Sequence, residues 1–388
     1  MIYADYNASS VLSDEVRQYL KERLENGPFA NPNAIHYLGK KVMEGITNSR
    51  QICAKNVGAD PDQLFFNSGS TEGIATVFYS LLTPQKRNTK HIVIISSIEH
   101  PAVLNTAIHY QKEFGFELKI LPVDNNGIVD TATLEKWLQD FGEKTALLSI
   151  MAANNETGII QPIEDISKMA NKYHVPMLCD TTQYIGKVPF DFEKSGIDYA
   201  VLSGHKIGAL TGIGFILAKD PTTMSPLFTG GGQEKGHRGG TQNYIGIESI
   251  AVALNKNSEK IVNWNKILDK KLDFETQIKK EFPKIVIIGE TVSRLPGTTY
   301  ISYPKLHGQA IQIELESHEI FVSTSAACSD NDIATSPALK AMNINDDVGR
   351  GVIRISLNHD SPVKNYDTIF ETLKAAYRKL EKLNKICP

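Results

Sequence analysis

Lys206 stands where a lysine could carry out covalent chemistry. It follows a short apolar run that ends at Leu202, and Ser203 and His205 come just before it. An amine that is desolvated at the end of a buried strand has a lowered pKa, so part of it is the neutral nucleophile that captures an aldehyde. A lone lysine in such a place is more often a surface residue that closes a strand. The chemical interpretation of Lys206 therefore depends on partners elsewhere in the chain.

A carboxylate follows another strand signal upstream. The apolar run 175–179 ends in Asp180, and Gln183 follows three residues later. Strands buried on both faces of a parallel sheet read as apolar runs, and ligands of open α/β sheets bind at the carboxyl ends of such strands. Asp180 could keep a pyridine nitrogen protonated, and Gln183 could donate to an oxygen on the same ring. The alternative is that Asp180 caps a helix.

A phosphate-binding turn is predicted nearer the N-terminus. Residues 63–66 read as a strand, the turn at 67–73 is rich in Gly, Ser and Thr, and an apolar-periodic helix signal follows over 74–82. The backbone N–H groups at a helix N-terminus, with the hydroxyls of Ser70 and Thr71, would bind a dianion. The same residues could instead form an ordinary helix cap, a Ser or Thr with a nearby Glu.

Two more polar loops follow strand signals, at 91–95 and 146–151. If the sheet is parallel, both loops emerge at the same edge as Asp180. His100, in the first loop, could stack on an aromatic ring and move protons near neutral pH, although a structural histidine in a turn beside proline is commoner. Asn155, in the second loop, could bind a substrate carboxylate, and the alternative is an ordinary Asn-rich turn.

In their order along the chain, these pieces resemble the fold-type I pyridoxal-phosphate enzymes, and specifically the cysteine desulfurases of the class V aminotransferase group. The resemblance also includes the segments 3–9 and 31–36, the glycine-rich run 230–241 and the Arg-Ile-Ser-Leu motif at 354–357. It covers nearly the whole chain. Each motif alone is weakly specific, and the order and context of the whole set carry the identification.

The resemblance implies an α/β fold, that of a fold-type I PLP-dependent transferase. A large domain at 14–258 would hold a mostly parallel seven-stranded sheet between helices, and residues 1–13 with 259–388 would form a smaller α+β domain carrying the cysteine loop. The alternation of strand-like and helical periods from Asp14 to Lys256 independently favours a parallel sheet covered on both faces.

The C-terminal part has its own predicted elements. In the charged stretch 257–280, apolar residues at helical spacing predict one amphipathic helix that leads into the second domain. The residues on its apolar face would be Ile261, Trp264, Leu268 and Leu272. Strands are predicted near 285–288, 298–302 and 352–357. The chain would end in a helix over 366–383.

The resemblance also implies roles for single residues. Lys206 would hold pyridoxal 5'-phosphate and act as the base, and His100 would stack on the ring and handle the protons of the substrate. Asn155 and Arg354 would bind the carboxylate of L-cysteine. Further cofactor contacts would come from Asp180 and Gln183 at the ring, and from Ser70, Thr71, Ser203 and His205 at the phosphate. Thr241 would reach the phosphate of a partner subunit, which implies a homodimer.

Cys328 separates a desulfurase from other enzymes with this cofactor. It lies in the small, polar segment 322–332, whereas Cys179 reads as a buried strand residue, Cys53 as a helix residue and Cys387 as tail. On position alone, Cys328 is an ordinary loop thiol. The resemblance implies that its thiolate takes the sulfur of L-cysteine, giving L-alanine and a persulfide. The sulfur would then pass to an acceptor protein, an iron–sulfur scaffold or a thiolation carrier.

Two departures from the family pattern lie near this chemistry. Ser325-Ala326 stands where relatives usually have Gly-Ser before Ala-Cys, and Asn358-His359 follows the Arg-x-Ser-Leu motif. The missing glycine could stiffen the loop. The alternatives left open are a selenocysteine lyase, another fold-type I lyase or aminotransferase, and, from a different class, a non-catalytic sulfur-relay scaffold.

Composition sets only broad limits. The 388 residues carry 41 basic and 44 acidic side chains, a formal charge of -3, which gives no electrostatic argument for direct contact with nucleic acid or an anionic membrane. The first residues do not read as a signal peptide and no apolar run reaches membrane-spanning length, so we predict a cytoplasmic protein. The four cysteines form no disulfide or zinc pattern, and no metal is expected.

Overall fold

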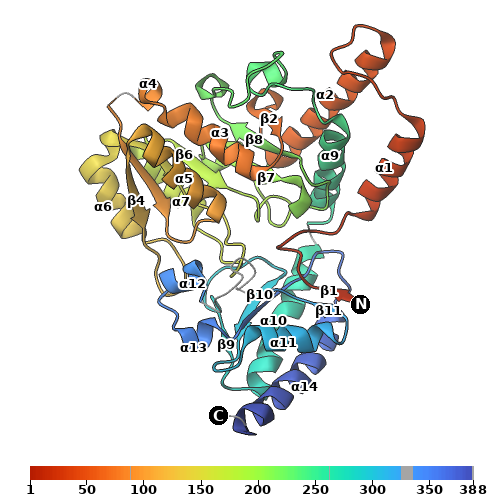
Figure 1. Cartoon of the computed structure of the whole chain (residues 1–388), viewed down its shortest axis with the longest axis vertical. Helices are drawn as coiled ribbons and strands as arrows, with labels where there is room; N and C mark the ends of the chain where they lie inside the picture. The colour runs from red at the N-terminus through yellow and green to blue at the C-terminus, as the bar shows by residue number, and fades with distance from the viewer. Residues whose placement is uncertain (88, 262, 325–334, 387–388) are drawn as a thin grey trace.

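The computed structural model describes residues 1–87, 89–261, 263–324 and 335–386 (Figure 1). A seven-stranded sheet forms in the order β2-β8-β7-β6-β5-β3-β4. β8 runs antiparallel to both of its neighbours, and the other pairs run parallel. The predicted mostly parallel, seven-stranded sheet is confirmed. Its strands are β2 (Leu64–Asn67), β3 (Ile92–Ser96), β4 (Glu117–Leu121), β5 (Thr145–Ser149), β6 (Met177–Asp180), β7 (Tyr199–Ser203) and β8 (Gly214–Ala218).

Helices cover both faces of this sheet, as predicted. On one face, α3 (Ser70–Leu82) and α5 (Pro101–Phe114) share a buried core with the strands. The other face packs against a larger core. The helices in that core are α1 (Asp14–Asn26), α2 (Tyr37–Val57), α6 (Thr131–Phe141), α7 (Ile163–Lys172) and α9 (Tyr244–Glu259). Since both faces are buried, inner strands such as β3 and β7 are largely apolar runs, whereas the edge strand β4 also carries charged residues.

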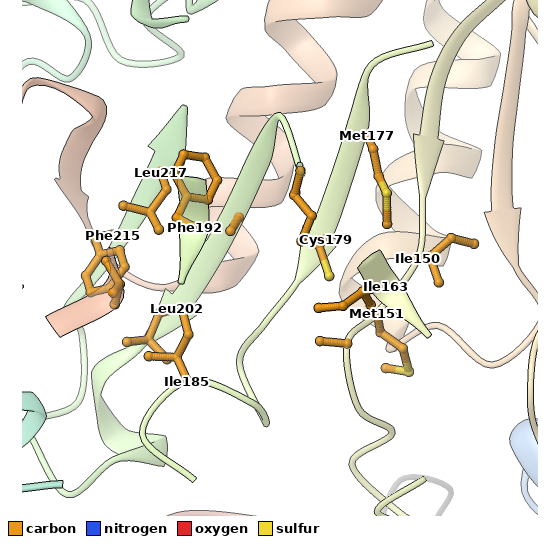
Figure 2. Close-up of a cluster of buried hydrophobic side chains, with 14 of the residues drawn as sticks. Ile150, Met151, Ile163, Met177, Cys179, Ile185, Phe192, Leu202, Phe215 and Leu217 are labelled. Atoms are coloured by element: carbon orange, nitrogen blue, oxygen red, sulfur yellow. The ribbon is translucent and has the colours of Figure 1, made fainter. Parts of the chain in front are cut away.

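β6 shows how the strands present chemistry at one edge. Figure 2 shows Met177 and Cys179 of β6 pointing into the same apolar cluster as Leu202 and Phe215. Because side chains alternate along a strand, Leu178 points into the core on the opposite face. Asp180 is the last residue of the strand. The apolar residues therefore anchor β6, and the carboxylate stands at the carboxyl edge of the sheet.

The remaining strands form two small sheets, drawn in the lower half of Figure 1. β9 (Val286–Ile287), β10 (Thr298–Ser302) and β12 (Val352–Ser356) form an antiparallel sheet, and β1 (Ile2–Tyr3) pairs with β11 (Ile320–Phe321). Ala4 packs in the same core as Ile353 and Tyr366. The helices here are α10 (Asn263–Glu281), α11 (Gly308–Glu316), α12 (Pro337–Ala341), α13 (Asp346–Gly349) and α14 (Asn365–Ile386). The domain boundary at 258/259 stays a prediction.

The predicted helix over 257–280 is confirmed from Asn263 onward, but it is not continuous with the residues before it. α9 ends at Glu259 and α10 begins at Asn263, and between them Lys260 bridges Glu15 (2.9 Å) and Asp360 (3.0 Å). Leu272 is 46% exposed, whereas Lys271 is 1% exposed and its Nζ donates to the Leu295 carbonyl at 3.1 Å. Of the predicted apolar face, Trp264 is buried and Ile261 packs against the same core, so the prediction fails at Leu272. No helix in the described ranges is long and apolar enough to cross a membrane.

Candidate active site

A cavity of about 270 Å³ opens at the carboxyl ends of the parallel strands. The loops after β2, β3, β5, β6 and β7 all reach it, because parallel strands end at the same edge of a sheet. The residues lining it that were predicted from the sequence are Ser70, Thr71, His100, Asn155, Asp180, Gln183, Ser203, His205 and Lys206. Thr182, Met151, Ala102 and Ala153 complete the lining.

Lys206 lies in the short 3-10 turn Gly204–Lys206 that follows β7. Its Nζ donates to the backbone carbonyls of Asn7 (2.8 Å) and Ala8 (2.7 Å). Burial and then the Arg354 charge lower the pKa of this amine, the carboxylates of Asp180 and Asp5 act in the opposite direction, and the resulting pKa is about 8. A lysine with this pKa is partly neutral near physiological pH. It is therefore able to act as a nucleophile and a base.

Asp180 and Gln183 lie together at the end of β6. Asp180 is 6% exposed, and its Oδ1 accepts the Thr182 N–H at 3.0 Å. No helix begins in the described residues that follow it, so the alternative of a helix cap is wrong. Gln183 is 4% exposed, and its Nε2 donates to the Asn7 carbonyl at 2.8 Å. A carboxylate and an amide donor thus share one side of the cavity.

The start of α3 offers donors for an anion. Gly69 occupies the N-cap position with φ 143°, and no side chain caps the helix. The N-cap residue therefore supplies no side-chain cap, while Glu72 accepts the Ser68 N–H at 2.9 Å and binds Arg238 at 3.0 Å. The Ser70 hydroxyl contacts the hydroxyls of Thr182 (2.5 Å) and Ser203 (3.0 Å). Three hydroxyls and an uncapped helix N-terminus are a suitable donor set for phosphate.

Both histidines of the cavity are held neutral. His100 caps α5, because its Nδ1 accepts the Ala102 N–H at 3.1 Å. The alternative of a structural histidine in a turn is therefore correct for the Nδ1 atom. With Nδ1 accepting, the neutral ring carries its proton on Nε2. Burial lowers the pKa of His100. Burial, with the charges of Lys206 and Lys187, lowers the pKa of His205 to about 4.

Arg354 lies next to the cavity on β12. Its Nη1 donates to the Asn155 carbonyl at 2.8 Å, and its Nη2 donates to Asp5 Oδ1 at 2.7 Å. The side chain is 8% exposed, and its buried Nε has no hydrogen-bond partner among the described residues. A buried guanidinium N–H without a partner costs free energy. A bound carboxylate would supply the missing acceptor.

Among the described residues, the predicted site residues that do not line this cavity are Arg354, beside it, and Thr241. Thr241 lines a separate cavity of about 60 Å³, together with Arg238 and Gln242. Cys328 lies outside the described residues, so its predicted role stays a prediction. Across the described ranges, no group of three or more His, Cys, Asp or Glu side chains is arranged to hold a metal ion.

The other two cysteines that the structure describes are poor nucleophiles. Cys53 on α2 and Cys179 on β6 are both fully buried and free. Burial raises the pKa of the Cys53 thiol and raises that of Cys179 well above its usual value. Both thiols therefore stay protonated. The predicted positions of Cys53 in a helix and of Cys179 in a buried strand are confirmed. Cys387 lies outside the described residues.

Sequence analysis missed several residues that shape the cavity. Asn7 and Lys187 are 3% and 6% exposed and bind the polar groups of the site. Glu99 accepts the Ser96 hydroxyl and the Met151 N–H, and burial raises the pKa of its carboxyl to about 8. The proximity of Glu99 to His100 and of Lys187 to Gln183 in the chain was visible. Their burial was not, because it depends on packing.

The residues present fit the predicted cofactor, pyridoxal 5'-phosphate. A lysine amine with a lowered pKa, an aspartate and an uncapped helix N-terminus with hydroxyls line one cavity. These groups correspond to the aldehyde, the ring nitrogen and the phosphate of that cofactor. A Cβ on Gly69 would approach Ser203 Oγ to 3.1 Å, so glycine keeps the backbone of the turn close to this hydroxyl.

Known proteins share both this sequence and this fold. Residues 2–368 match the Aminotransferase class-V family. The cysteine desulfurase IscS of Dictyoglomus turgidum is 32% identical over all of this chain and 96% of the relative. A solved structure described as a NifS-like protein superposes with a TM-score of 0.89 at 32% identity, covering 98% of this chain and 100% of that one.

A second solved structure is described as SspA in complex with cysteine. It is 28% identical, with a TM-score of 0.78 over 92% of this chain and 99% of that chain. The identity to curated relatives, the coverage and the fold agree. The chain therefore belongs to the aminotransferase class-V family and, within it, to the PLP-dependent cysteine desulfurases of the NifS/IscS type.

Proposed function

We propose that this cysteine desulfurase works on free L-cysteine, forms L-alanine, and keeps the sulfur as a persulfide on Cys328 for transfer to an acceptor protein. The observation that carries the proposal is the single cavity in which Lys206, Asp180 and the α3 N-terminus meet, with the Arg354 guanidinium beside it. The acceptor would be an iron–sulfur scaffold or a thiolation carrier. A cytoplasmic location remains part of the prediction.

The proposed roles at the cavity follow from these contacts. When bound, pyridoxal 5'-phosphate supplies an aldehyde that an amine can capture and a ring that takes up the electron pair released at the substrate Cα. Lys206 Nζ, with a pKa of about 8, accepts the Cα proton. Asp180 keeps a proton on the ring nitrogen. His100 presents its Nε2–H for the protons of the substrate, since its Nδ1 is occupied by Ala102.

The sulfur step is assigned to Cys328. Its thiolate forms an S–S bond with the sulfur of the substrate while the Cβ–S bond breaks, and the electron pair of that bond stays on Cβ. Protonation of Cβ leads to alanine, and the sulfur remains on Cys328 as a persulfide. A thiolate of the acceptor protein then takes the outer sulfur and releases the Cys328 thiolate.

A homodimer is part of the proposal. Thr241 lies outside the cavity of its own chain, so a partner is needed if it is to reach a phosphate. Large apolar side chains that a partner could cover are exposed: Phe29 (51%), Ile35 (90%), Tyr37 (70%) and Phe228 (51%). Sedimentation equilibrium should give twice the mass of one chain.

The proposed substrate binding makes a prediction for Asp5. Replacing Asp5 with asparagine should raise KM for L-cysteine about tenfold and leave kcat within about twofold, because Arg354 loses the charge-assisted bond that orients its guanidinium. Steady-state alanine formation measures this. Asp14→Asn is the control, since Asp14 pairs with Arg17 on the surface at 2.7 Å. A fall in kcat at unchanged KM would contradict the assignment.

The function is tested on the purified wild type. We expect an absorption band near about 420 nm from the bound cofactor, and one alanine for each sulfide released with L-cysteine and an added thiol reductant. A band with selenide release from selenocysteine but no turnover of cysteine would favour the lyase. A colourless protein that cannot be reconstituted with the cofactor would favour the scaffold.

A further inference from the structure

Lys187 is a buried amine that the proposed mechanism does not use. It lies in the turn after β6, where its backbone N–H donates to the Tyr184 carbonyl at 3.1 Å. Its side chain is 6% exposed and turns back toward Gln183, four residues earlier. It does not line the cavity. Any effect of Lys187 on the chemistry must therefore pass through the residues that it contacts.

The Nζ of Lys187 contacts two amide oxygens. It donates to Gln183 Oε1 at 2.5 Å and to Asn7 Oδ1 at 3.0 Å. Burial, reinforced by the charges of Lys206 and Arg354, lowers the pKa of this amine well below its usual value. Two N–H groups of Lys187 thus each have an acceptor, one on each amide.

These bonds decide which way both amides face. With its oxygen held by Lys187, Asn7 directs its Nδ2 to Thr298 Oγ1 (3.0 Å) and to the Asn155 carbonyl (3.3 Å). Gln183 likewise keeps its Nε2 toward the Asn7 carbonyl at 2.8 Å, where Lys206 Nζ also donates. Among the described residues, Gln183 Nε2 donates only to the Asn7 carbonyl, which leaves its second N–H available.

We propose that Lys187 is a positioning residue that fixes the orientation of the Gln183 amide, so that its N–H2 group and not its carbonyl faces the cofactor cavity. A donor at this place stabilises an anionic oxygen on the bound ring, whereas a carbonyl oxygen would repel it. Lys187 thus tunes the protonation of the cofactor without touching it. This inference rests on the cofactor binding at the proposed cavity.

The experiment follows the absorption of the holoenzyme with pH, in the absence of substrate. Lys187→Met removes both donors at nearly constant side-chain length. We expect the pH midpoint of the spectral change to rise by roughly one unit, because the ring oxygen loses its donor and its anionic form is destabilised. Gln183→Leu should raise the midpoint similarly. The double variant should match Gln183→Leu alone, since Lys187 acts through Gln183.

Lys271→Met is the matched control. Lys271 is equally buried, and burial lowers its pKa to about 7, but it lies in the core of the small sheet and bonds the Leu295 carbonyl. The Lys271→Met variant should be less stable than the wild type, and the pH midpoint of its spectral change should be that of the wild type. A folded Lys187→Met protein with the wild-type midpoint would overturn the proposal, as would shifts that add fully in the double variant.

A second variant covers the case in which Lys187→Met does not fold. Lys187→Gln keeps an N–H2 donor on a side chain one bond shorter, and its midpoint should lie closer to wild type than to Gln183→Leu. A midpoint equal to that of Gln183→Leu would overturn the proposal. Absence of the cofactor band in the wild type itself would overturn the proposed function and this inference with it. A wild type that shows the band, with a midpoint that Lys187 does not affect, would overturn this inference alone.

Discussion

Replacing Lys206 with alanine should lower kcat for alanine formation by about 10²–10⁴-fold or more and abolish the absorption band of the covalently held cofactor. Among the described residues that line the cavity, Lys206 is the one lysine. Its amine, with a pKa of about 8, is available both for capture of the aldehyde and for transfer of the Cα proton. Alanine should be quantified under saturating L-cysteine, with a spectrum taken of each preparation.

Lys219→Ala is a suitable control, because Lys219 follows β8 and is exposed. It should keep the wild-type spectrum and rate. Lys206→Arg should behave like Lys206→Ala, since a guanidinium keeps its charge but is neither a nucleophile nor a base at neutral pH. A Lys206→Ala enzyme with more than about a tenth of the wild-type kcat would exclude the assigned role.

Replacing Cys328 with alanine should remove turnover of L-cysteine and leave the cofactor band intact. We expect alanine formation to fall by at least about 10²-fold, because neither of the thiols that the structure describes can accept the sulfur. Cys53 and Cys179 are fully buried, with raised pKa values, and neither lines the cavity. The measurement is alanine produced per enzyme, together with the spectrum before and after L-cysteine is added.

Cys53→Ala provides the matched thiol deletion and should keep wild-type turnover with a modest loss of stability. If Cys328→Ala still produced alanine from L-cysteine at the wild-type rate, the persulfide step would be wrong. A lyase that expels the sulfur without a protein nucleophile would then explain the data better. This comparison also tests whether Ser325-Ala326, in place of the usual Gly-Ser, still allows the loop to serve the reaction.

Much of the fold and of the cavity could be predicted because the signals are local. The strand predicted over 298–302 has the same bounds in the structure, and Asp180 ends a strand as its apolar run predicted. Polar residues that follow apolar runs lie at strand ends, and the ends of parallel strands meet at one edge. Ser70, His100, Asn155 and Lys206 therefore converge without any knowledge of long-range contacts.

The predictions that failed concern which side of an element is buried. In α10, helical spacing allows neighbouring stripes, and the structure buries Lys271 rather than Leu272, because a carbonyl is available to the amine. The Glu72 side chain was considered as part of a cap, but it pairs with Arg238, which is distant in the chain. Local patterns give no information on such partners.

The sequence by itself determined the sheet, the order of its strands along the chain, the family and the residue types at the edge of the sheet, since each depends on neighbouring residues. Only the tertiary structure decided what surrounds them. Asn7 and Lys187 meet 180 positions apart, and Arg354 reaches Asp5 across 349. Burial and the resulting pKa values of Lys206, Glu99 and Lys187 arise from the packing of the whole chain, because desolvation depends on every segment that excludes water.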